Sequence, residues 1–279
     1  MSLIVLATSA DEPDLTTSDA LYAEALRRHG FSVVGAPWNG PAAAFDDAAA
    51  VVIRSTWGYY RTPEAFRLWT EAMAAATRLF NPIELVRWNL RKEYVGDLAA
   101  AGVRVPGTHI VARDLAAIDR VFDETGWSRA VVKPVTGASG HAVELLTRGT
   151  VAAALPRLAG DAVLVQEFLP EIAEGEVSLV YFDGAFSHAI RKRPPAGEFR
   201  VNSRFGATRA AERPSPAVVE QGAAALRPLP ALPLYARVDG VVRGETLIVI
   251  EVEVLEPALF LEFDPASAER FAEATVKRL

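Results

Sequence analysis

Two neighbouring stretches of this chain carry opposite charge and hold side chains that could do chemistry. The stretch 191–213 has seven basic residues and two acidic ones, whereas the stretch 239–264 has seven acidic residues and one arginine. Glu251 and Glu253 lie in an otherwise apolar run from Leu247 to Leu255. A strand repeats every two residues, so both carboxylates project from one face. On a buried strand they repel each other and lose hydration, so they require a compensating cation.

A divalent metal ion bound together with a polyphosphate would meet this requirement. Mg²⁺ prefers oxygen ligands, and a basic loop nearby would hold the phosphate oxygens. The predicted strand 235–242 precedes the Glu251 strand, and Asp239 falls opposite Glu251 if residues 244–246 stay unpaired between them. We therefore expect Asp239, Glu251 and Glu253 to form a metal site. The alternative, a solvated sheet face that carries charges, fits less well because the intervening residues are apolar.

A lysine and a loop of small residues follow another predicted strand. The strand 130–134 contains Lys133 and runs into the loop 135–141. Glycines let backbone N–H groups approach a phosphate closely, and the lysine supplies a point charge. No Gly-Lys-Ser/Thr follows, so this is not a Walker A loop, and taken alone the segment also fits a plain hairpin turn. If the loop does bind phosphate, the candidate residues in it are Thr136, Gly137, Ser139 and Gly140.

Two further segments could complete a nucleotide site. The run 163–170 reads as a buried strand that enters a chain reversal. Its backbone groups could pair with the rim of an adenine while apolar side chains pack on the ring faces, although a plain core strand is the simpler interpretation. Glu176 begins the next strand, where its carboxylate could accept hydrogen bonds from ribose hydroxyls. The candidate residues in the first run are Gln166, Glu167, Phe168 and Leu169.

A substrate site is predicted at the end of a strand in the N-terminal region. The strand 50–54 runs into Arg54, Ser55, Thr56 and Trp57, and ligands of open parallel sheets bind at this edge. We expect these four residues to contact the acceptor substrate. In the alternative interpretation Trp57 belongs to the core and Arg54 pairs with a local carboxylate.

Composition limits the possible functions. The 279 residues suffice for two or three lobes, and no run approaches the roughly 18 apolar residues of a membrane span. The absence of cysteine excludes disulfides and thiol catalysis, and it fits a cytoplasmic location. The net charge of −6 argues against nucleic acid as the main partner. We expect the partners to be small-molecule substrates and expect no association with a membrane. The sequence leaves open whether the protein forms a homodimer.

The order of predicted elements indicates an α/β fold. Strands and helices alternate up to about residue 88, which predicts a parallel sheet without a Rossmann fingerprint. A helix is expected over 89–101, and a mobile basic loop over 193–214. After residue 176 the pattern becomes antiparallel, with two hairpins. The other expected elements are strands 3–7, 31–36, 178–182 and 186–191, and helices 18–29 (capped by Ser18 or Thr17), 63–76, 114–125, 150–158, 216–226 and 266–278.

The ordered set of motifs resembles the ATP-grasp superfamily, in particular its carboxylate–amine ligases such as D-alanine–D-alanine ligase, glutathione synthetase and RimK. The segments 53–57, 81–89 and 256–261 look closest to the O-ureido-D-serine cyclo-ligase of cycloserine biosynthesis. The resemblance implies a pre-ATP-grasp lobe over 1–88 and an ATP-grasp domain over 89–279, with a small central lobe at about 104–168 and a C-terminal antiparallel-sheet lobe at about 169–279. The motifs are Lys92, Val132-Lys133-Pro134, Gln166–Leu169, Gly175–Ser178, Arg237-Val238-Asp239 and Glu251-Val252-Glu253.

The resemblance also implies roles for single residues. Lys92 and Lys133 would hold ATP phosphates, and Glu167 and Leu169 would contact adenine through their backbones. Arg237 would stabilise an anionic intermediate, so it is a catalytic candidate with Lys133 and Arg200. Arg191, Lys192 and Arg200 would meet phosphate or a substrate carboxylate. Many relatives carry Asn where Glu253 stands, which leaves the number of metal ions open, and Mn²⁺ could replace Mg²⁺.

The implied reaction is ATP- and Mg²⁺-dependent. A small substrate carboxylate would be activated as an acyl phosphate with release of ADP, and an amine would displace the phosphate to form a C–N bond. Both steps build negative charge, which preorganised cations stabilise. The alternatives are an intramolecular cyclo-ligase of the O-ureidoserine type, a phosphotransferase, and a nucleotide-binding protein without turnover.

Overall fold

The N-terminal region forms a parallel sheet, as its alternating pattern predicts. The computed structural model describes all residues, 1–279, and orders this sheet β2-β1-β3-β4. Every pair of neighbouring strands is parallel. The helix α1 begins one residue earlier than expected, because Thr16, and neither Thr17 nor Ser18, accepts the capping bond from the Asp19 N–H. The elements are β1 (Leu3–Thr8), α1 (Thr17–Arg28), β2 (Ser32–Pro37), β3 (Ala48–Ile53), α2 (Pro63–Ala76) and β4 (Arg78–Phe80).

The prediction of one helix over 89–101 is wrong. The structure has two short helices, α3 (Ile83–Asn89) and α4 (Tyr94–Ala100), with a turn between them. The side chain of Asn89 donates to Val252 O and accepts from Val254 N, so the end of α3 is tied to the C-terminal sheet. The backbone N–H of Lys92 donates to Val135 O at 2.9 Å instead of continuing a helix. These bonds place Lys92 between two lobes.

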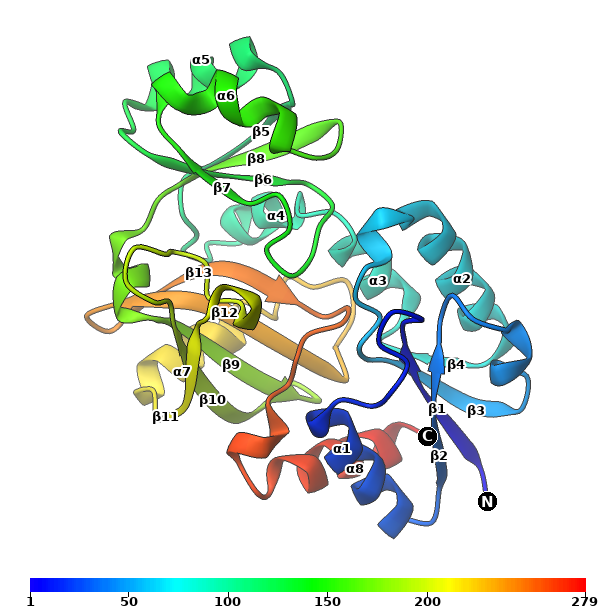
Figure 1. The fold of residues 1–279 in the computed structure, drawn as a ribbon. Coiled ribbons are helices and arrows are strands. Elements are labelled where there is room, and N and C mark those ends of the chain that lie inside the picture. Colours follow the sequence, from blue (N-terminus) through cyan, green and yellow to red (C-terminus); the bar gives the residue numbers. More distant parts are fainter.

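A small antiparallel sheet with two helices forms the central lobe, at the top of Figure 1. The strand order is β5-β8-β6-β7. Asp114 caps α5 by accepting from Ala117 N, and Gly126 ends it with φ of +68°, as the sequence predicts. The elements are β5 (Thr108–Ala112), α5 (Leu115–Thr125), β6 (Ala130–Pro134), β7 (Glu144–Leu146), α6 (Val151–Ala154) and β8 (Ala162–Glu167).

The C-terminal lobe is a five-stranded antiparallel sheet in the order β11-β10-β9-β12-β13, with α7 (Pro216–Ala224) packed on it. The prediction of a mobile loop over 193–214 is wrong in part, because residues 208–212 form a strand that pairs with β10. That pairing gives the basic segment a fixed edge. The strands are β9 (Glu176–Phe182), β10 (Ala185–Arg193), β11 (Thr208–Glu212), β12 (Tyr235–Arg243) and β13 (Thr246–Glu253).

The hairpin β12–β13 has the register that the sequence predicts, but reaches it by another route. Asp239 lies opposite Glu251, and Arg237 lies opposite Glu253. The turn leaves two residues unpaired, not three, because Arg243 pairs with Thr246. The additional residue is taken up by a β-bulge after Asp239, where Gly240 pairs with Val249. Both arrangements give the same pairing of Asp239 with Glu251, because a two-residue turn plus one bulge residue offsets β13 against β12 by as much as a three-residue turn.

The C-terminal helix α8 (Ser267–Arg278) returns to the N-terminal lobe. Tyr22 stacks on Phe271 with ring centroids 3.8 Å apart, and its hydroxyl bonds Thr275 at 2.6 Å. One apolar core joins residues of β1 and α1 with Phe182, Tyr235 and α8. The expected α/β fold of three lobes is therefore confirmed, whereas the division at residues 88 and 89 stays a prediction. No helix has both the length and the apolar character needed to cross a bilayer.

Candidate active site

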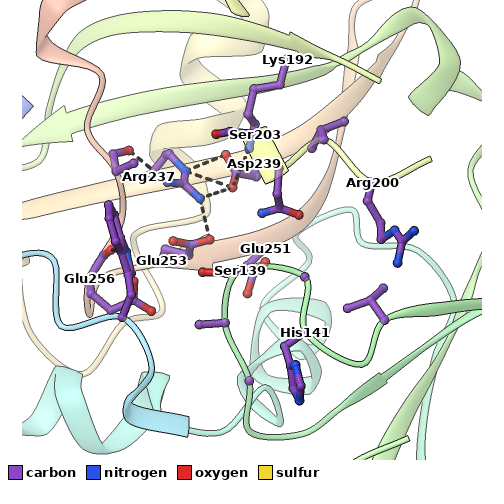
Figure 2. Close-up of a pocket in the computed structure, with 18 of the residues that line it drawn as sticks. Ser139, His141, Lys192, Arg200, Ser203, Arg237, Asp239, Glu251, Glu253 and Glu256 are labelled. Atoms are coloured by element: carbon purple, nitrogen blue, oxygen red, sulfur yellow. Dashed lines mark hydrogen bonds and ion pairs between the residues drawn. The ribbon is translucent and has the colours of Figure 1, made fainter. Parts of the chain in front are cut away.

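One cavity of about 690 Å³ takes its wall from all three lobes and holds most of the expected site residues (Figure 2). Its wall includes the acidic hairpin, three lysines, the loop after β6 and the chain reversal after β8. The expected residues in the wall are Arg54, Trp57, Lys92, Lys133, Gly137, Ser139, Gly140, Gln166, Glu167, Phe168, Leu169, Glu176, Lys192, Arg200, Arg237, Asp239, Glu251 and Glu253. Ser55, Thr56, Thr136 and Arg191 lie outside it.

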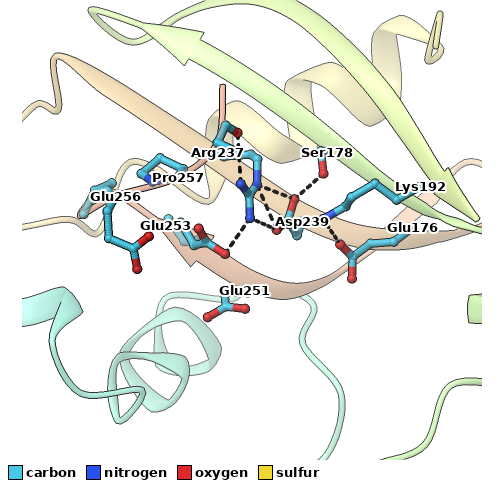
Figure 3. Close-up of polar contacts among 12 residues, drawn as sticks. Glu176, Ser178, Lys192, Arg237, Asp239, Glu251, Glu253, Glu256 and Pro257 are labelled. Atoms are coloured by element: carbon cyan, nitrogen blue, oxygen red, sulfur yellow. Dashed lines mark hydrogen bonds and ion pairs between the residues drawn. The ribbon is translucent and has the colours of Figure 1, made fainter. Parts of the chain in front are cut away.

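Arg237 is the centre of the polar network on the hairpin (Figure 3). Its guanidinium binds both oxygens of Asp239 at 2.8–3.0 Å and one oxygen of Glu253 at 2.5 Å. Asp239 also accepts from Ser178 at 2.5 Å and lies 3.4 Å from the Lys192 ammonium. Because the guanidinium is a planar fork with five N–H groups, a lysine could not make the same bonds.

Burial and ion pairing act differently on the two carboxylates that Arg237 bridges. Burial pushes the pKa of Asp239 upward, but attraction by Arg237 and Lys192 outweighs it and lowers the pKa to about 2. Burial raises the pKa of Glu253 to about 7. Arg237 acts in the opposite direction and lowers this pKa, whereas repulsion by Glu251 raises it further. Glu253 is therefore the carboxylate of this pair with unused capacity for a cation.

The hairpin suits a divalent cation at Glu251 and Glu253 better than at Asp239. No three acidic or histidine side chains converge on one point in this conformation. Both oxygens of Asp239 already accept bonds from protein donors, and its side chain is only 4% exposed. Glu251 pairs with Lys92, Glu253 with Arg237, and both carboxylates line the cavity at 22–24% exposure. Carboxylate oxygens side by side on one face are a donor set that fits Mg²⁺.

Three lysines reach the cavity from different elements, and they differ in their partners. Lys92 pairs with Glu251, and Lys192 pairs with Glu176 at 2.5 Å. Lys133, 6% exposed, has no carboxylate partner. Burial lowers the pKa of Lys133, while Glu251 opposes the shift. A buried ammonium without a partner at a cavity wall is suited to an anion.

The loop after β6 lies against the basic segment that follows β10. A Cβ atom at Gly140, where φ is +67°, would lie 2.6 Å from the Asn202 side chain, so the two loops touch and only glycine fits. The ring of His141 stacks on Tyr60 of the N-terminal lobe with centroids 4.9 Å apart. Both contacts place the loop over the cavity. Thr136 lies outside the wall, so the expectation for this residue is not met.

The chain reversal after β8 has two backbone N–H groups without a protein acceptor, at Phe168 and Leu169. The Glu167 N–H donates to Gly107 O at 2.8 Å, so it has no capacity left for an adenine. The Leu169 N–H has no protein acceptor, and Leu169 lines the cavity. Phe168 lies under the Arg129 guanidinium, 4.3 Å from ring centroid to Cζ. Glu176 faces Lys192, and burial raises the pKa of its carboxyl.

Comparisons with known proteins agree with this geometry. A family model described as the N-terminal domain of D-cycloserine synthetase DcsG matches residues 4–81, and one described as the ATP-grasp domain of prokaryotic glutathione synthetase matches residues 98–229. The cycloserine biosynthesis protein DcsG of Streptomyces lavendulae is 34% identical over 100% of this chain and 99% of its own length. The chain belongs to the ATP-grasp superfamily, in the family of DcsG.

Solved structures extend the likeness to the whole fold. The crystal structure of D-cycloserine synthetase DcsG covers 99% of both chains with a TM-score of 0.89 and 31% identity. A RimK-domain ATP-grasp protein from Sphaerobacter thermophilus covers 98% of this chain and 99% of its own, with a TM-score of 0.72 and 20% identity. The resemblance found in the motifs, and the ATP-grasp fold that it implied, are confirmed. Members of this superfamily use ATP and Mg²⁺.

Two of the arginines expected in the ATP-grasp cavity are bound to nearby carboxylates. Arg191 lies outside the wall because Glu212 of β11 holds it at 2.7 Å and Gly175 O accepts a second bond. Arg200 lines the cavity but pairs with Glu198 at 2.7 Å and lies over the ring of Phe205. Neither guanidinium is free for a phosphate in this conformation.

The predicted substrate residues after β3 support the fold more than they face the cavity. Arg54, 2% exposed, binds Asp19 at 2.8 Å and Pro257 O at 2.8 Å, and its remaining nitrogen is buried. The Trp57 ring N–H donates to Glu256 O at 3.2 Å. Ser55 and Thr56 are buried away from the cavity, since the end of β3 stays bonded to Ala7 O. Substrate contact by Ser55 and Thr56 is therefore not what the structure shows.

An Arg54→Met substitution should destabilise the ATP-grasp protein by about 3–5 kcal/mol, because Asp19 would keep a buried charge without a partner. Urea unfolding would measure this loss. The matched control is Arg28→Met, which breaks the exposed pair with Glu269 and should cost at most about 1 kcal/mol. The double variant Arg54→Met/Asp19→Asn should recover part of the loss. A stable Arg54→Met protein with a raised KM would instead return Arg54 to substrate binding.

Sequence reasoning assigned no role to Glu256, although the residue lies in a quoted motif. Its carboxylate lines the cavity and is labelled in Figures 2 and 3. The available signal was an isolated acidic residue inside the apolar run 254–260, the same kind of signal that singled out Glu251 and Glu253.

Proposed function

We propose that this ATP-grasp protein is an ADP-forming ligase that activates a small carboxylate as an acyl phosphate and joins it to an amine in a C–N bond. One observation carries the proposal. The hairpin register places Arg237 and Asp239 opposite Glu253 and Glu251, in the wall of the cavity that also holds Lys133. A cationic fork, paired carboxylates and an unpaired ammonium in one cavity suit phosphoryl and acyl transfer.

The lysines and the loop after β6 provide a site for a triphosphate. Lys133 has no competing partner, whereas Lys92 and Lys192 can exchange a carboxylate for a phosphate oxygen. The free N–H of Leu169 suits an adenine acceptor, and the Glu176 carboxylate suits ribose hydroxyls. Glu251 and Glu253 would hold Mg²⁺, and Asp239 would position Arg237 beside Glu253. The bound metal would neutralise phosphate charge and polarise the transferred group.

The chain's own residues can then serve both chemical steps. Arg237 is fixed by Asp239, Glu253 and Ala258 O, so its N–H groups need no reorganisation when charge develops nearby. The contact of the 137–141 loop with Asn202 and Tyr60 would exclude water, which protects an acyl phosphate from hydrolysis.

An intramolecular cyclo-ligase of the O-ureidoserine type is the second candidate. The likeness to DcsG over the full length of both chains favours it. In that reaction the attacking nitrogen and the activated carboxylate belong to one molecule, so no second amine is consumed.

Release of ADP separates these candidates. Purified protein with ATP and Mg²⁺ is incubated with carboxylate and amino-acid pools, with and without amines, and products are identified by mass. ADP release that needs a second amine supports a ligase, and loss of water or a small group from one substrate supports the cyclo-ligase. A stable phosphorylated product would indicate a phosphotransferase. Absence of ADP with every pool would overturn the proposal in favour of a binding protein.

A Lys133→Ala substitution should weaken binding of ADP or a non-hydrolysable ATP analogue by about 10- to 100-fold, because one charge-assisted bond to phosphate is lost. Isothermal titration calorimetry would measure the affinity. Lys277→Ala is the matched control, since Lys277 is 74% exposed and pairs with Asp183 outside the cavity. Equal affinities of the Lys133→Ala and wild-type proteins would remove Lys133 from the phosphate site.

A further inference from the structure

The backbone of segment 254–259, which follows β13, is fixed by side-chain hydrogen bonds to each of its carbonyl groups. Six consecutive backbone oxygens accept side-chain hydrogen bonds from the N-terminal and C-terminal lobes. Such a segment presents its own side chains from a fixed backbone. The bonds are Asn81 to Val254 O (2.7 Å), Tyr235 to Leu255 O (2.9 Å), Trp57 to Glu256 O (3.2 Å), Arg54 to Pro257 O (2.8 Å), Arg237 to Ala258 O (2.9 Å) and His188 with Leu259 O (2.8 Å).

Glu256 is the one acidic side chain on this fixed segment, and it has no partner. It is 7% exposed and lines the cavity. No side-chain hydrogen bond or ion pair reaches its carboxylate, and in Figure 3 every dashed line ends on other residues. Buried carboxylates in folded proteins are normally paired. An unpaired one on a held backbone is a site prepared for a cation.

No cation of the protein bonds to the Glu256 carboxyl group. Burial first, and then repulsion by Glu253, raises the pKa of Glu256 well above its usual range. The cations that attract Glu256 are already bound, Arg237 to Asp239 and Glu253, and Lys92 to Glu251. Burial disfavours the ionised form of Glu256 until another cation approaches, so this carboxyl group suits a ligand that brings a positive charge.

The position of Glu256 in the cavity distinguishes a substrate cation from a phosphate-bound metal. In Figure 3 Glu256 lies at one end of the row of charged side chains, and Lys192 and Glu176 lie at the other. The carbonyl of Glu256 itself accepts from Trp57, and that of the next residue, Pro257, accepts from Arg54, so both donors come from the N-terminal lobe. Glu256 thus lies away from Lys192, on the side of the N-terminal lobe, and in this view Glu253 lies between it and Arg237.

We propose that Glu256 binds the ammonium group of an amino-acid substrate and so orients the carboxylate of that substrate toward Arg237. The inference rests on the proposed function and narrows it, because it names the residue that selects substrates with a free ammonium group. In an amino acid the ammonium and the carboxylate are joined through one carbon, so a single anchor fixes both. Glu256 is then a specificity-determining residue, and a carboxylic acid without the amino group is a poor substrate.

The test compares amino acids with their des-amino analogues, such as D- and L-serine with 3-hydroxypropionate and D- and L-alanine with propionate. ADP release from wild-type protein should favour the amino-acid member of a pair. Glu256→Gln, which keeps shape but removes charge, should raise KM for the amino acid by about 10- to 100-fold and leave KM for ATP unchanged. The preference over the des-amino analogue should shrink by the same factor.

Two controls separate this role from a structural one. Glu262→Gln makes the same substitution at an exposed position on the cavity rim and should keep wild-type discrimination. The melting temperature of Glu256→Gln should equal or exceed that of wild type, because the substitution removes a buried charge without a partner. A lower melting temperature with unchanged discrimination would mean that Glu256 only supports the fold, and would overturn the inference.

The remaining outcomes are also decisive. Wild-type turnover with equal discrimination by Glu256→Gln overturns the role of Glu256 and leaves the proposed ligase standing. A raised Mg²⁺ requirement with unchanged KM for the amino acid would place Glu256 at the metal, against the inference. If wild-type protein releases ADP only with carboxylates that lack an amino group, the inference fails and the proposed ligase stands. If it releases no ADP with this panel or with the wider carboxylate and amino-acid pools, the proposed function fails and the inference fails with it.

Discussion

A Glu251→Gln variant is expected to stay folded and to lose Mg²⁺-dependent ATP turnover by on the order of 10³-fold. Glu251 and Glu253 are the cavity carboxylates with room for a metal, and a bound metal contributes several kcal/mol to the transition state. The substitution removes one of the two carboxylates that would hold the ion. Folding should persist because Asn89 ties β13 to α3 through backbone atoms on either side of Glu253.

Turnover at graded Mg²⁺ concentrations, followed by ADP release, would measure this effect, and circular dichroism would check the fold. Glu245→Gln is the matched control, since Glu245 is an exposed acid in the turn of the same hairpin and lies outside the cavity. High Mg²⁺ should restore part of the lost activity if affinity is affected. Retention of full activity at every Mg²⁺ concentration would remove Glu251 from the metal site.

The hairpin shows how much of this site the sequence could predict. The two-residue period and the apolar neighbours of Glu251 and Glu253 were sufficient to place both carboxylates on one buried face. The register with Asp239 was also correct, although the turn is one residue shorter than expected and a bulge replaces that residue. The pairing of two strands depends on the total number of unpaired residues in the turn and in any bulge. The sequence pattern indicates this total, but it does not show which of the residues lie in the turn and which in the bulge.

The errors have a common physical cause, which is tertiary hydrogen bonding that local patterns do not contain. The helix expected over 89–101 is interrupted because Lys92 bonds to Val135 O. The basic segment 193–214 was expected to be mobile, but part of it adds a strand to β10. Arg54 was expected to face a substrate, but Asp19, 35 residues earlier, neutralises it. Each partner lies far away in the chain, so composition and periodicity give no indication of it.

The network around Arg237 pairs most of the charged side chains of the candidate site. Four carboxylates from β9, β12 and β13 (Glu176, Asp239, Glu251 and Glu253) face the cations Lys92, Lys192 and Arg237. This pairing leaves Lys133 and Glu256 as the two buried charges without partners. Lys133 is basic and suits a phosphate, and Glu256 is acidic and suits an ammonium group. The two side chains without partners therefore agree with the two proposed ligands, a nucleotide phosphate and an amino-acid substrate.

Substituting Arg237 is expected to have the largest combined effect on activity and stability. Arg237→Met would strand Asp239 and Glu253 as buried charges, so we expect a loss of about 3–5 kcal/mol in the free energy of unfolding. The developing oxyanion would also lose its fixed donor, which should reduce kcat by about 10²–10³-fold. Arg237→Lys should recover some stability but little activity, because an ammonium cannot reproduce the planar fork. Urea unfolding and ADP release would measure the two effects.

The double variant Arg237→Met/Asp239→Asn separates the two roles of the arginine, because it leaves Glu253 of the proposed metal site unchanged. Removing the Asp239 charge together with its partner should restore part of the lost stability, since the most deeply buried carboxylate of the network is no longer uncompensated. Activity should not return, because no other N–H group occupies the position of the guanidinium. If kcat recovered together with the melting temperature, Arg237 would be a scaffold for the hairpin, and the stabilising donor for the acyl-transfer step would have to come from Lys133 or Lys192.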